Sequence, residues 1–451
     1  MLIPNSIPSK EPVLRVGIVL PGDRFTEIQI VVPETPKYRL SGPAGYGLGL
    51  AGGDKLHFRI DKSAISVLVN GESIVNGTGD FWKIEPIRKV AKIRNKMGLK
   101  VCNVAAGRGF HWVKNIDVFL PGAVELSVVD KVLMVANELP IEQYLMCVAT
   151  SEMGAACPPA LIESQTIVAR SWMLANVEMK HRDLNVDVCN DDCCQRYQGT
   201  TFLNDESVRG AMNTFGKVLI SDGKICDARY FKSCGGITEG FEHVFGDEPV
   251  KYLQPVIDAP DTFSYPSLPL DTEEKVRNWI FDEPETFCSP GTVPEKELIN
   301  YLGSVDVEGK YFRWRFRYTQ KEMTALLNLK LNLAAKAILK ITPLKRGFSG
   351  RITRLEIRYC NQAGEQMTTE IEDQYNIRQT LHELFLYSSA FVVDVEAGQD
   401  EVPKAFILIG AGWGHGVGYC QIGALGMALK GYSAEEIVLH YYPGSKLQKI
   451  Y

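Results

Sequence analysis

The sequence has no apolar run of about eighteen residues or more, the length that a membrane-spanning helix requires. The stretch Met1–Phe25 lacks a basic start, an apolar segment and a small-residue cleavage site, so we expect neither a signal peptide nor a transmembrane segment. Charge of one sign is not in excess, because 49 Lys and Arg stand against 54 Asp and Glu, a formal net charge of −5. That balance disfavours a protein held to nucleic acid by phosphate contacts, and we expect no nucleic-acid partner.

Several catalytic signatures are also missing. The chain contains no Gly-x-Ser-x-Gly elbow of a serine hydrolase and no His-Glu-x-x-His of a zinc protease. The stretch Gly47-x-Gly49-x-x-Gly52 matches a dinucleotide fingerprint, but an alternating strand follows it where that mechanism requires a helix N-terminus. We therefore interpret it as a turn between strands. The glycine-rich run Gly412–Gly418 lacks a following Lys-Ser/Thr, which excludes a P-loop.

The length of 451 residues suggests about two or three domains, and the order of segments predicts an α+β fold that is mostly β. A helical pair is set among strands, and additional β-rich segments follow it. Strands are expected at 14–20, 63–69, 124–129, 218–220, 228–231 and 405–409, and helices at about 140–153, 159–179 and 319–329. Capping boxes are expected at Thr319–Glu322 and Ser433–Glu436.

The composition shifts along the chain predict four regions. Residues 1–120 form an N-terminal β-rich region, and residues 121–255 form a core with the helical pair and a Cys/His loop. Residues 256–400 are a connector and an α/β insertion, with an extended part rich in Pro, Asp, Thr and Glu over 255–305 and a single helix between 311 and 393. Residues 401–451 contain a Gly-rich motif that completes the core.

Eleven cysteines are present, and an odd total cannot be fully paired. His181, Cys189, Cys193 and Cys194 lie within one loop and offer a tetrahedral zinc ligand set, or three ligands with an open position. Unligated or disulfide-bonded cysteines are the alternative, which the local sequence leaves open. Neighbouring Cys193 and Cys194 are not expected to bond each other, because a vicinal ring is strained, nor to serve one metal site together.

Glu152 is the strongest candidate for a proton donor. It lies in the last turn of the first expected helix, where the negative end of the helix dipole disfavours a charged carboxylate. In an apolar site such a carboxyl can donate a proton near neutral pH, whereas a solvated surface glutamate is the alternative. Glu142 lies at the positive end of the same helix, and Glu163 lies in the body of the next one, so both are weaker candidates.

Taken together, these segments resemble the SpoIID/LytB family, which includes stage II sporulation protein D and amidase enhancers. The order and spacing agree over most of residues 120–255 and 405–451. The matching segments are Leu139–Leu145, Ser151–Met153, Gln165–Ser171, Asp187–Cys189, Cys194–Gly199, Tyr230–Glu239, Gly412–Gly423 and His440–Gly444.

The resemblance implies a lytic transglycosylase that cleaves the MurNAc–GlcNAc bond of denuded peptidoglycan glycan strands and leaves a 1,6-anhydro product. It implies that Glu152 is the catalytic acid. It also implies one structural zinc ion held by His181, Cys189 and Cys194, with Cys193 as the alternative thiol. The substrate-binding residues that it implies are Arg170, Gln195, Tyr197, Tyr230, Lys232, Ser233, Thr238, Glu239, Trp413 and His415.

Glycan strands in the cell envelope, either the periplasm or the cell wall, are the implied partner, although the expected absence of a signal peptide conflicts with that location. The alternative function is a non-catalytic cell-wall-binding enhancer of an N-acetylmuramoyl-L-alanine amidase. A zinc hydrolase built on the cysteine loop is weaker, because thiolate-rich zinc sites are usually structural. Cys234 and Cys420 stand where the family commonly has serine. The remaining cysteines are expected to serve as small apolar residues: Cys102, Cys147, Cys157, Cys226, Cys288 and Cys360.

Overall fold

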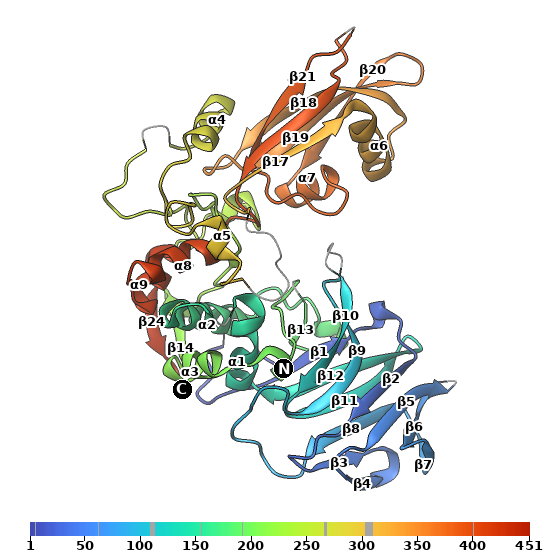
Figure 1. Cartoon of the computed structure of the whole chain (residues 1–451). Helices are drawn as coiled ribbons and strands as arrows, with labels where there is room; N and C mark the ends of the chain where they lie inside the picture. Colours follow the sequence, from blue (N-terminus) through green and yellow to red (C-terminus); the bar gives the residue numbers. More distant parts are fainter. Residues whose placement is uncertain are drawn as a thin grey trace. The chain divides into compact units, whose positions relative to one another are not determined.

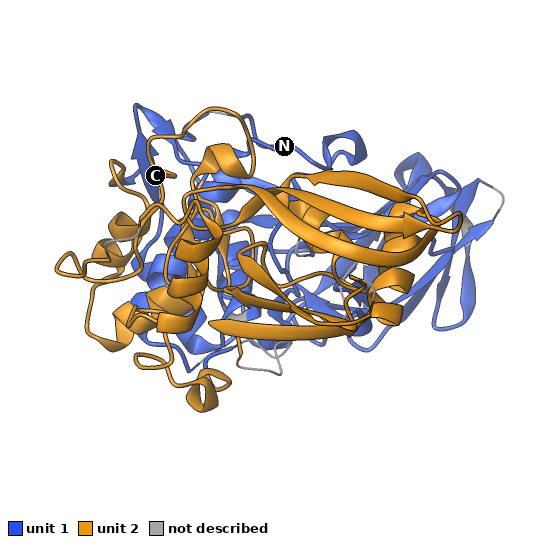
Figure 2. Cartoon of the chain, turned by 90° about the horizontal axis from the view of Figure 1, so that it is seen from above, with its two compact units in different colours: residues 1–227, 301–305, 447–451 blue, residues 228–300, 306–446 orange. Residues whose placement is uncertain are grey.

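The computed structural model shows a mixed α+β fold that is mostly β, as predicted (Figure 1). It describes residues 1–451 except 5, 62, 109–112, 155, 192, 266–267, 303–309 and 400, and it leaves the side chains of 75–78 and 150 undescribed. The chain divides into two compact units, which Figure 2 shows in different colours. Unit 1 comprises 1–227, 301–305 and 447–451, and unit 2 comprises 228–300 and 306–446.

Two sheets make up most of unit 1, and their strands alternate between buried and exposed residues. In β2, for example, Ile28 and Ile30 are buried while Glu27 and Gln29 are exposed, which places one face of the strand in the core. The described strands of the first sheet have the order β13-β1-β12-β11-β8-β3-β4, and those of the second have the order β10-β9-β2-β5-β6-β7. Their bounds are β1 (Val13–Val19), β2 (Glu27–Val31), β3 (Tyr38–Ser41), β4 (Gly47–Leu50), β5 (Lys55–Asp61), β6 (Ala64–Val69), β7 (Glu72–Gly79), β8 (Phe81–Pro86), β9 (Leu99–Ala106), β10 (Lys114–Leu120), β11 (Ala123–Val129), β12 (Val132–Pro140) and β13 (Val188–Cys189).

Three helices of unit 1 pack against one another: α1 (Ile141–Glu152), α2 (Pro159–Ala175) and α3 (Asp205–Asn213). A small sheet of β15 (Lys224–Ile225), β14 (Lys217–Ser221) and β24 (Lys446–Lys449) accompanies them. The prediction that the first helix begins at Pro140 was wrong by one residue, because Pro140 still pairs in β12 and caps α1. The predicted end of the second helix at Met179 was also wrong. Asn176 adopts φ 46° and ψ 42°, a left-handed conformation that ends α2 at Ala175.

A short parallel pair joins the two ends of unit 2. In it, β16 (Tyr230–Phe231) pairs with β23 (Tyr419–Cys420), which leads into α8 (Gln421–Leu429) and α9 (Ala434–Tyr441). Two further sheets have the orders β17-β22-β21 and β18-β19-β20. The bounds of the other elements are α4 (Glu273–Asp282), α5 (Glu295–Leu298), β17 (Arg313–Thr319), α6 (Gln320–Leu331), β18 (Ala335–Arg346), β19 (Ile352–Asn361), β20 (Gln366–Glu372), α7 (Gln374–Thr380), β21 (Phe391–Glu396) and β22 (Ala405–Ala411).

Some local predictions are confirmed and others are corrected. Both capping boxes form, at the N-termini of α6 and α9. The stretch 255–305 is not simply extended, because it contains α4 and α5; its residues 266–267 and 303–305 lie outside the described part of the chain. α7 is a second helix between 311 and 393. Gly47 and Gly49 lie in β4, whereas Gly52 lies in the predicted turn, between β4 and β5. Among the described residues, no helix is both long and apolar enough to cross a membrane.

Candidate functional site

Glu152 is the last residue of α1, and its side chain is held in a largely dry environment. The residue is 8% exposed. The backbone N–H of Arg196 donates to its Oε1 over 3.1 Å, and the Arg196 guanidinium donates to the Ser151 carbonyl over 3.4 Å. Beyond the helix, the Gly154 N–H donates to the Tyr301 carbonyl over 2.7 Å. The carboxyl group therefore has a fixed position between the end of α1 and the loop that contains Arg196.

Two residues next to Arg196, Gln195 and Tyr197, brace that loop from inside the protein. Both are 0% exposed. Gln195 accepts a hydrogen bond from the Tyr144 hydroxyl over 3.1 Å and donates to the Ala169 carbonyl over 3.1 Å. The Tyr197 ring stacks on the Tyr144 ring with centroids 4.9 Å apart. In this structure Gln195 and Tyr197 thus position the Arg196 N–H on Glu152 and do not present their side chains to solvent. Tyr144 and Arg196 were not singled out from the sequence, although both stand inside the matching segments.

Arg170 on α2 is also fully buried. Its guanidinium makes an ion pair with Glu142 at the start of α1 and donates to the Lys217 carbonyl over 3.0 Å. The Tyr451 hydroxyl donates to the same Glu142 carboxylate over 2.8 Å. A cation held in this way stabilises the packing of α1 and α2. Nothing in its contacts places the guanidinium at a surface where a sugar could bind.

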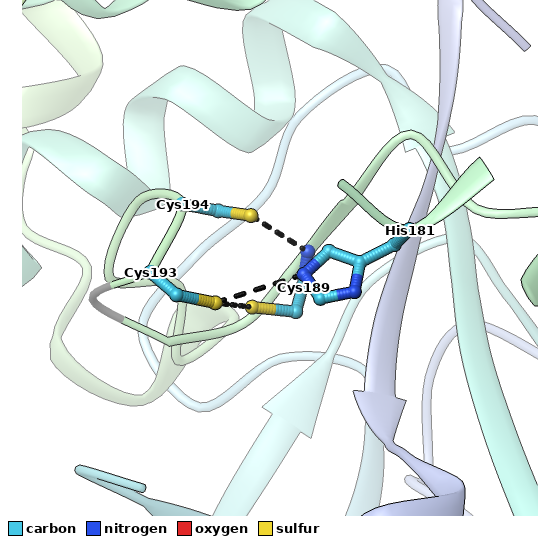
Figure 3. Close-up of side chains that lie close together, drawn as sticks. All are labelled: His181, Cys189, Cys193 and Cys194. Atoms are coloured by element: carbon cyan, nitrogen blue, oxygen red, sulfur yellow. Dashed lines mark hydrogen bonds between the residues drawn. The ribbon is translucent and has the colours of Figure 1, made fainter. Parts of the chain in front are cut away.

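The predicted metal ligands of unit 1 come together in space (Figure 3). One donor atom from each of His181, Cys189, Cys193 and Cys194 lies within 4.8 Å of the others. The sulfurs of Cys189 and Cys193 are 3.0 Å apart, and the Cys193 sulfur is 3.6 Å from Nε2 of His181. Parallel pairing of β13 with β1, which puts Cys189 beside Gly17, fixes the position of one ligand. The sequence favours only one of Cys193 and Cys194 as a ligand, but the loop brings both sulfurs into one group, so both are close enough to serve a single site.

This cluster fits a single tetrahedral metal ion. Zinc bonds of about 2.3 Å to sulfur and about 2.0 Å to nitrogen place neighbouring donors about 3.5–3.8 Å apart. Hydrogen bonds from Cys189 and Cys194, with a further contribution from His181, lower the pKa of the Cys193 thiol. The hydrogen bond with Cys193 in turn raises the pKa of Cys189 to about 12. The lowered pKa of Cys193 favours the thiolate, which is the form in which cysteine binds metal.

In unit 2, His415 has both ring nitrogens engaged by the backbone. Its Nε2 donates to the Tyr230 carbonyl over 3.0 Å, and its Nδ1 accepts from the Val417 N–H over 3.1 Å. Burial, followed by the nearby charge of Arg229, lowers the pKa of His415 well below its ordinary value. A neutral imidazole bonded at both nitrogens holds the glycine-rich loop against β16.

Trp413, in the same loop, is half-buried within an aromatic group. Its ring stacks on Tyr387 with centroids 4.3 Å apart and an interplanar angle of 10°, and it also contacts Tyr311 at 4.6 Å. Two neighbouring rings therefore fix the orientation of the indole. A partly exposed, rigid indole remains suited to stacking on a sugar ring.

The predicted polar residues of the Tyr230–Glu239 segment have different environments. Glu239 is 0% exposed and accepts hydrogen bonds from His243 Nδ1 over 3.0 Å and from the Ser349 hydroxyl over 2.6 Å. Thr238 bonds the Val256 backbone. Both are therefore internal. Lys232 and Tyr230 are partly exposed, whereas the hydroxyl of Ser233 is buried with no hydrogen-bond partner among the described residues.

The site residues predicted from the sequence thus form separate groups within each unit. Unit 1 brings Gln195 and Tyr197 together behind Glu152, and it assembles the His181 cluster. Unit 2 brings His415 onto β16 and leaves Trp413 in an aromatic group.

Comparisons with known proteins match two parts of the chain to family models and most of it to two relatives. Residues 129–220 match a family model described as stage II sporulation protein, and residues 239–418 match one described as a domain of unknown function. The chain is 24% identical over 361 residues to an uncharacterized protein of Brachyspira hyodysenteriae, a match that covers 79% of this chain and 81% of that protein. It is also 24% identical over 328 residues to the amidase enhancer of Bacillus subtilis, covering 66% of this chain but 39% of the enhancer.

Proposed function

Because this chain belongs to the stage II sporulation protein D family through residues 129–220, we propose that it acts on the cell wall as a peptidoglycan lytic transglycosylase. Its substrate is the glycan strand, and the bond cleaved joins N-acetylmuramic acid to N-acetylglucosamine. The observation that carries the proposal is the position of Glu152 at the end of α1, largely buried and held by the Arg196 backbone N–H. We place the protein in the cell envelope, where this polymer lies.

Glu152 acts first as an acid and then as a base. The protonated carboxyl donates its proton to the glycosidic oxygen as the bond from that oxygen to C1 of the muramic acid breaks. The C6 hydroxyl of the same sugar attacks C1, and Glu152 takes the hydroxyl proton. The products are a free N-acetylglucosamine hydroxyl and a 1,6-anhydro end. No water enters, so one carboxyl group is sufficient.

Residues of unit 2 that remain partly exposed are the proposed sugar contacts. Unit 2 by itself offers the cation of Lys232 for a lactyl carboxylate of the glycan strand and the ring face of Trp413 for a sugar of that strand. Tyr230, which is also partly exposed, stands in the same segment as Lys232 and is proposed as its neighbour in binding, whereas Ser233 is fully buried in this structure. Arg170, Gln195, Tyr197, Thr238, Glu239 and His415 support the fold in this structure.

The His181 cluster is proposed to hold one structural zinc ion. Three thiols and one imidazole complete a tetrahedral shell and leave no open position for water, which is the pattern of structural rather than catalytic zinc. Zinc bound there cross-links the loop from His181 to Cys194. The same loop continues into Arg196, whose N–H holds Glu152.

The proposed activity is tested with purified glycan strands stripped of their stem peptides. Wild-type chain is expected to release anhydro-ended fragments, detected by mass spectrometry, whereas Glu152→Gln releases fewer by about a hundredfold or more, because it cannot donate the proton. Glu163→Gln, on the partly exposed face of α2, is the matched control and retains activity. Undiminished release by Glu152→Gln rules out the proposed role.

A second candidate is supported by the similarity to the Bacillus subtilis amidase enhancer. In this function the chain binds the cell wall and stimulates a separate N-acetylmuramoyl-L-alanine amidase. Such an enhancer needs no acid, so Glu152→Gln stimulates the amidase as well as the wild type does. Stimulation by both chains, without anhydro products from either, favours this candidate over the enzyme.

A further inference from the structure

A second group of side chains that could hold a metal ion lies in unit 2, and it includes none of the residues that the sequence predicts to be metal ligands. It consists of Cys234, Asp258, Cys288 and Cys420, with one donor atom from each residue within 4.8 Å of the others. All four are buried, with exposures of 2%, 0%, 2% and 0% respectively. Cys288, which the sequence predicts to be a small apolar residue, is buried among these donor atoms. The four residues come from separate segments of the chain, so the fold itself gathers them.

The sulfurs in this group accept hydrogen bonds from backbone N–H groups. Gly236 donates to the Cys234 sulfur over 3.4 Å, and Gly423 and Cys234 donate to the Cys420 sulfur over 3.3 and 3.2 Å. Cys420 is also the N-cap of α8, where the positive end of the helix favours a thiolate. Gly235 and Gly236, which follow Cys234, adopt φ values of 71° and 106°, a left-handed backbone that favours glycine. The backbone thus directs N–H groups at the sulfurs of Cys234 and Cys420.

Asp258 contributes an oxygen donor that is held in place on both sides. The Cys288 N–H donates to its Oδ2 over 2.8 Å, and the Tyr441 hydroxyl donates to its Oδ1. Within the described part of the chain, no lysine or arginine forms an ion pair with this carboxylate. A Cβ atom on Gly423 would overlap the carboxylate, so α8 reaches it only because residue 423 is glycine. A buried carboxylate without a cation is costly, and a carboxylate has lone pairs left for a metal after two hydrogen bonds.

We propose that Cys234, Cys288, Cys420 and Asp258 bind one structural zinc ion. The Cys234 and Cys288 sulfurs are 3.5 Å apart, close to the separation of about 3.8 Å that two sulfurs on one tetrahedral zinc require. Three thiolates favour zinc, copper(I) or iron over magnesium or calcium, and the hard carboxylate oxygen disfavours copper(I). An iron–sulfur cluster needs its ligands farther apart, because inorganic sulfide lies between them. The Tyr441 hydroxyl and the Cys288 N–H orient the carboxylate as an outer shell.

The zinc ion has a clear structural role in unit 2. Cys234 and Cys420 stand just outside the two ends of the segment 239–418, which matches the domain of unknown function, while Asp258 and Cys288 stand inside it. One metal ion therefore ties both ends of this long segment to β16 and β23. Closing long loops is where a metal cross-link gains most over the unfolded chain. This role does not depend on cleavage of glycan.

The test is the zinc content of the purified full-length chain, measured by mass spectrometry of the elements in metal-controlled buffer. We expect the Cys288→Ser and Cys420→Ser chains to contain about one equivalent of zinc less than the wild type. Cys360→Ser, a cysteine of the same unit outside the group, retains the wild-type content. A chain with both His181→Ala and Cys193→Ala, which disrupts the His181 cluster of unit 1, is expected to hold about one equivalent of zinc. Its zinc absorption edge shows three sulfur ligands and one oxygen ligand.

The chain with both His181→Ala and Cys193→Ala tests the proposal even if the Cys288→Ser and Cys420→Ser chains do not fold, because it leaves all four proposed ligands unchanged. Absence of zinc from a folded His181→Ala, Cys193→Ala chain overturns the proposal, as does a zinc shell with fewer than three sulfurs. A disulfide between Cys234 and Cys288 in the chain as isolated also overturns it. Loss of anhydro products with zinc retained contradicts the proposed enzyme but leaves the zinc site standing.

Discussion

The guanidinium of Arg170 on α2 donates two hydrogen bonds to the carboxylate of Glu142 on α1, one from Nε over 2.9 Å and one from Nη2 over 2.6 Å. Both side chains are buried, at 0% and 4% exposure. The pair joins the N-terminal turn of α1 to the body of α2, while Glu152 occupies the other end of α1. The pair therefore fixes the N-terminal end of the helix whose last residue is the proposed acid.

Arg170→Met is predicted to lower the free energy of unfolding by about 3–5 kcal/mol, because it leaves the Glu142 carboxylate buried and unpaired. Arg209→Met breaks the exposed pair with Glu206 on α3 and is predicted to cost less than about 1 kcal/mol. Urea unfolding followed by circular dichroism measures both. A small effect of Arg170→Met on stability, with a large rise in KM for glycan, contradicts the structural role and supports the sugar contact that the resemblance implies.

Tyr197→Phe is predicted to lower the free energy of unfolding by about 1–3 kcal/mol. The Tyr197 hydroxyl donates to Asn137 Oδ1 over 2.6 Å, and Asn137 uses its amide nitrogen on two backbone carbonyls, so the substitution leaves a buried acceptor unsatisfied. Tyr375→Phe, at a residue 60% exposed, serves as the control and is expected to be neutral. Equal unfolding midpoints for the two variants would show that the Tyr197 hydroxyl does not contribute to the free energy of unfolding.

The Glu239–His243 pair is predicted to make the stability of unit 2 depend on pH. Burial raises the pKa of Glu239, but hydrogen bonds from His243 and Ser349 outweigh it, so the pKa lies below the ordinary 4.5. The hydrogen bond with Glu239 raises the pKa of His243 above 6.5. The Glu239 contribution is present above pH 4.5 and is lost as the pH falls through its lowered pKa. The His243 contribution is present below pH 6.5 and is lost as the pH rises through its raised pKa.

The pair therefore stabilises the fold most between pH 4.5 and 6.5. His243→Gln is expected to lower the thermal midpoint most within that window and progressively less at higher pH. His57→Gln, at a surface histidine of unit 1, is the control. The interpretation is wrong if the loss caused by His243→Gln stays constant or grows as the solution becomes alkaline.

Removal of metal from the His181 cluster is predicted to loosen its loop without unfolding the sheets of unit 1. The Cys193→Ala chain should contain about one equivalent of zinc less than the wild type and should be cleaved faster by protease between His181 and Cys194. Cys102→Ser, on β9 and outside the cluster, should match the wild type in both assays. Zinc content below about half an equivalent in a careful wild-type preparation argues against a tight site here.

The sequence predicts several strands of unit 1, among them those at 14–20, 63–69 and 124–129, together with α1 and both capping boxes, because their signals are local. The alternation in β6 and the Thr319–Glu322 pair can each be recognised within a few residues. The His181 cluster is also visible, since its four ligands lie in one loop. The ligand group around Asp258 is not, because Cys234, Cys288 and Cys420 meet only after the chain folds.

The contacts of buried polar residues also cannot be predicted from the sequence. Arg170 stands in a matching segment and has the charge expected of a sugar contact, but only the packing of α1 against α2 shows its partner, Glu142. In the same way, only the structure shows that Tyr144 and Tyr197 support the loop next to Glu152. The Tyr144 hydroxyl bonds Gln195 in that loop, and the two tyrosine rings stack on each other. The proposed acid could be chosen from the sequence, whereas the residues that fix its position required the structure.

The most direct test of the proposed chemistry is whether water enters the product. Denuded glycan strands are incubated with the wild-type chain in water enriched in heavy oxygen, and the new muramic acid ends are weighed by mass spectrometry. Intramolecular attack by the C6 hydroxyl, assisted by Glu152, predicts anhydro ends that lack one water and carry no heavy oxygen. Reducing ends that carry heavy oxygen from the solvent, lost in Glu152→Gln, would contradict a transglycosylase and identify a hydrolase.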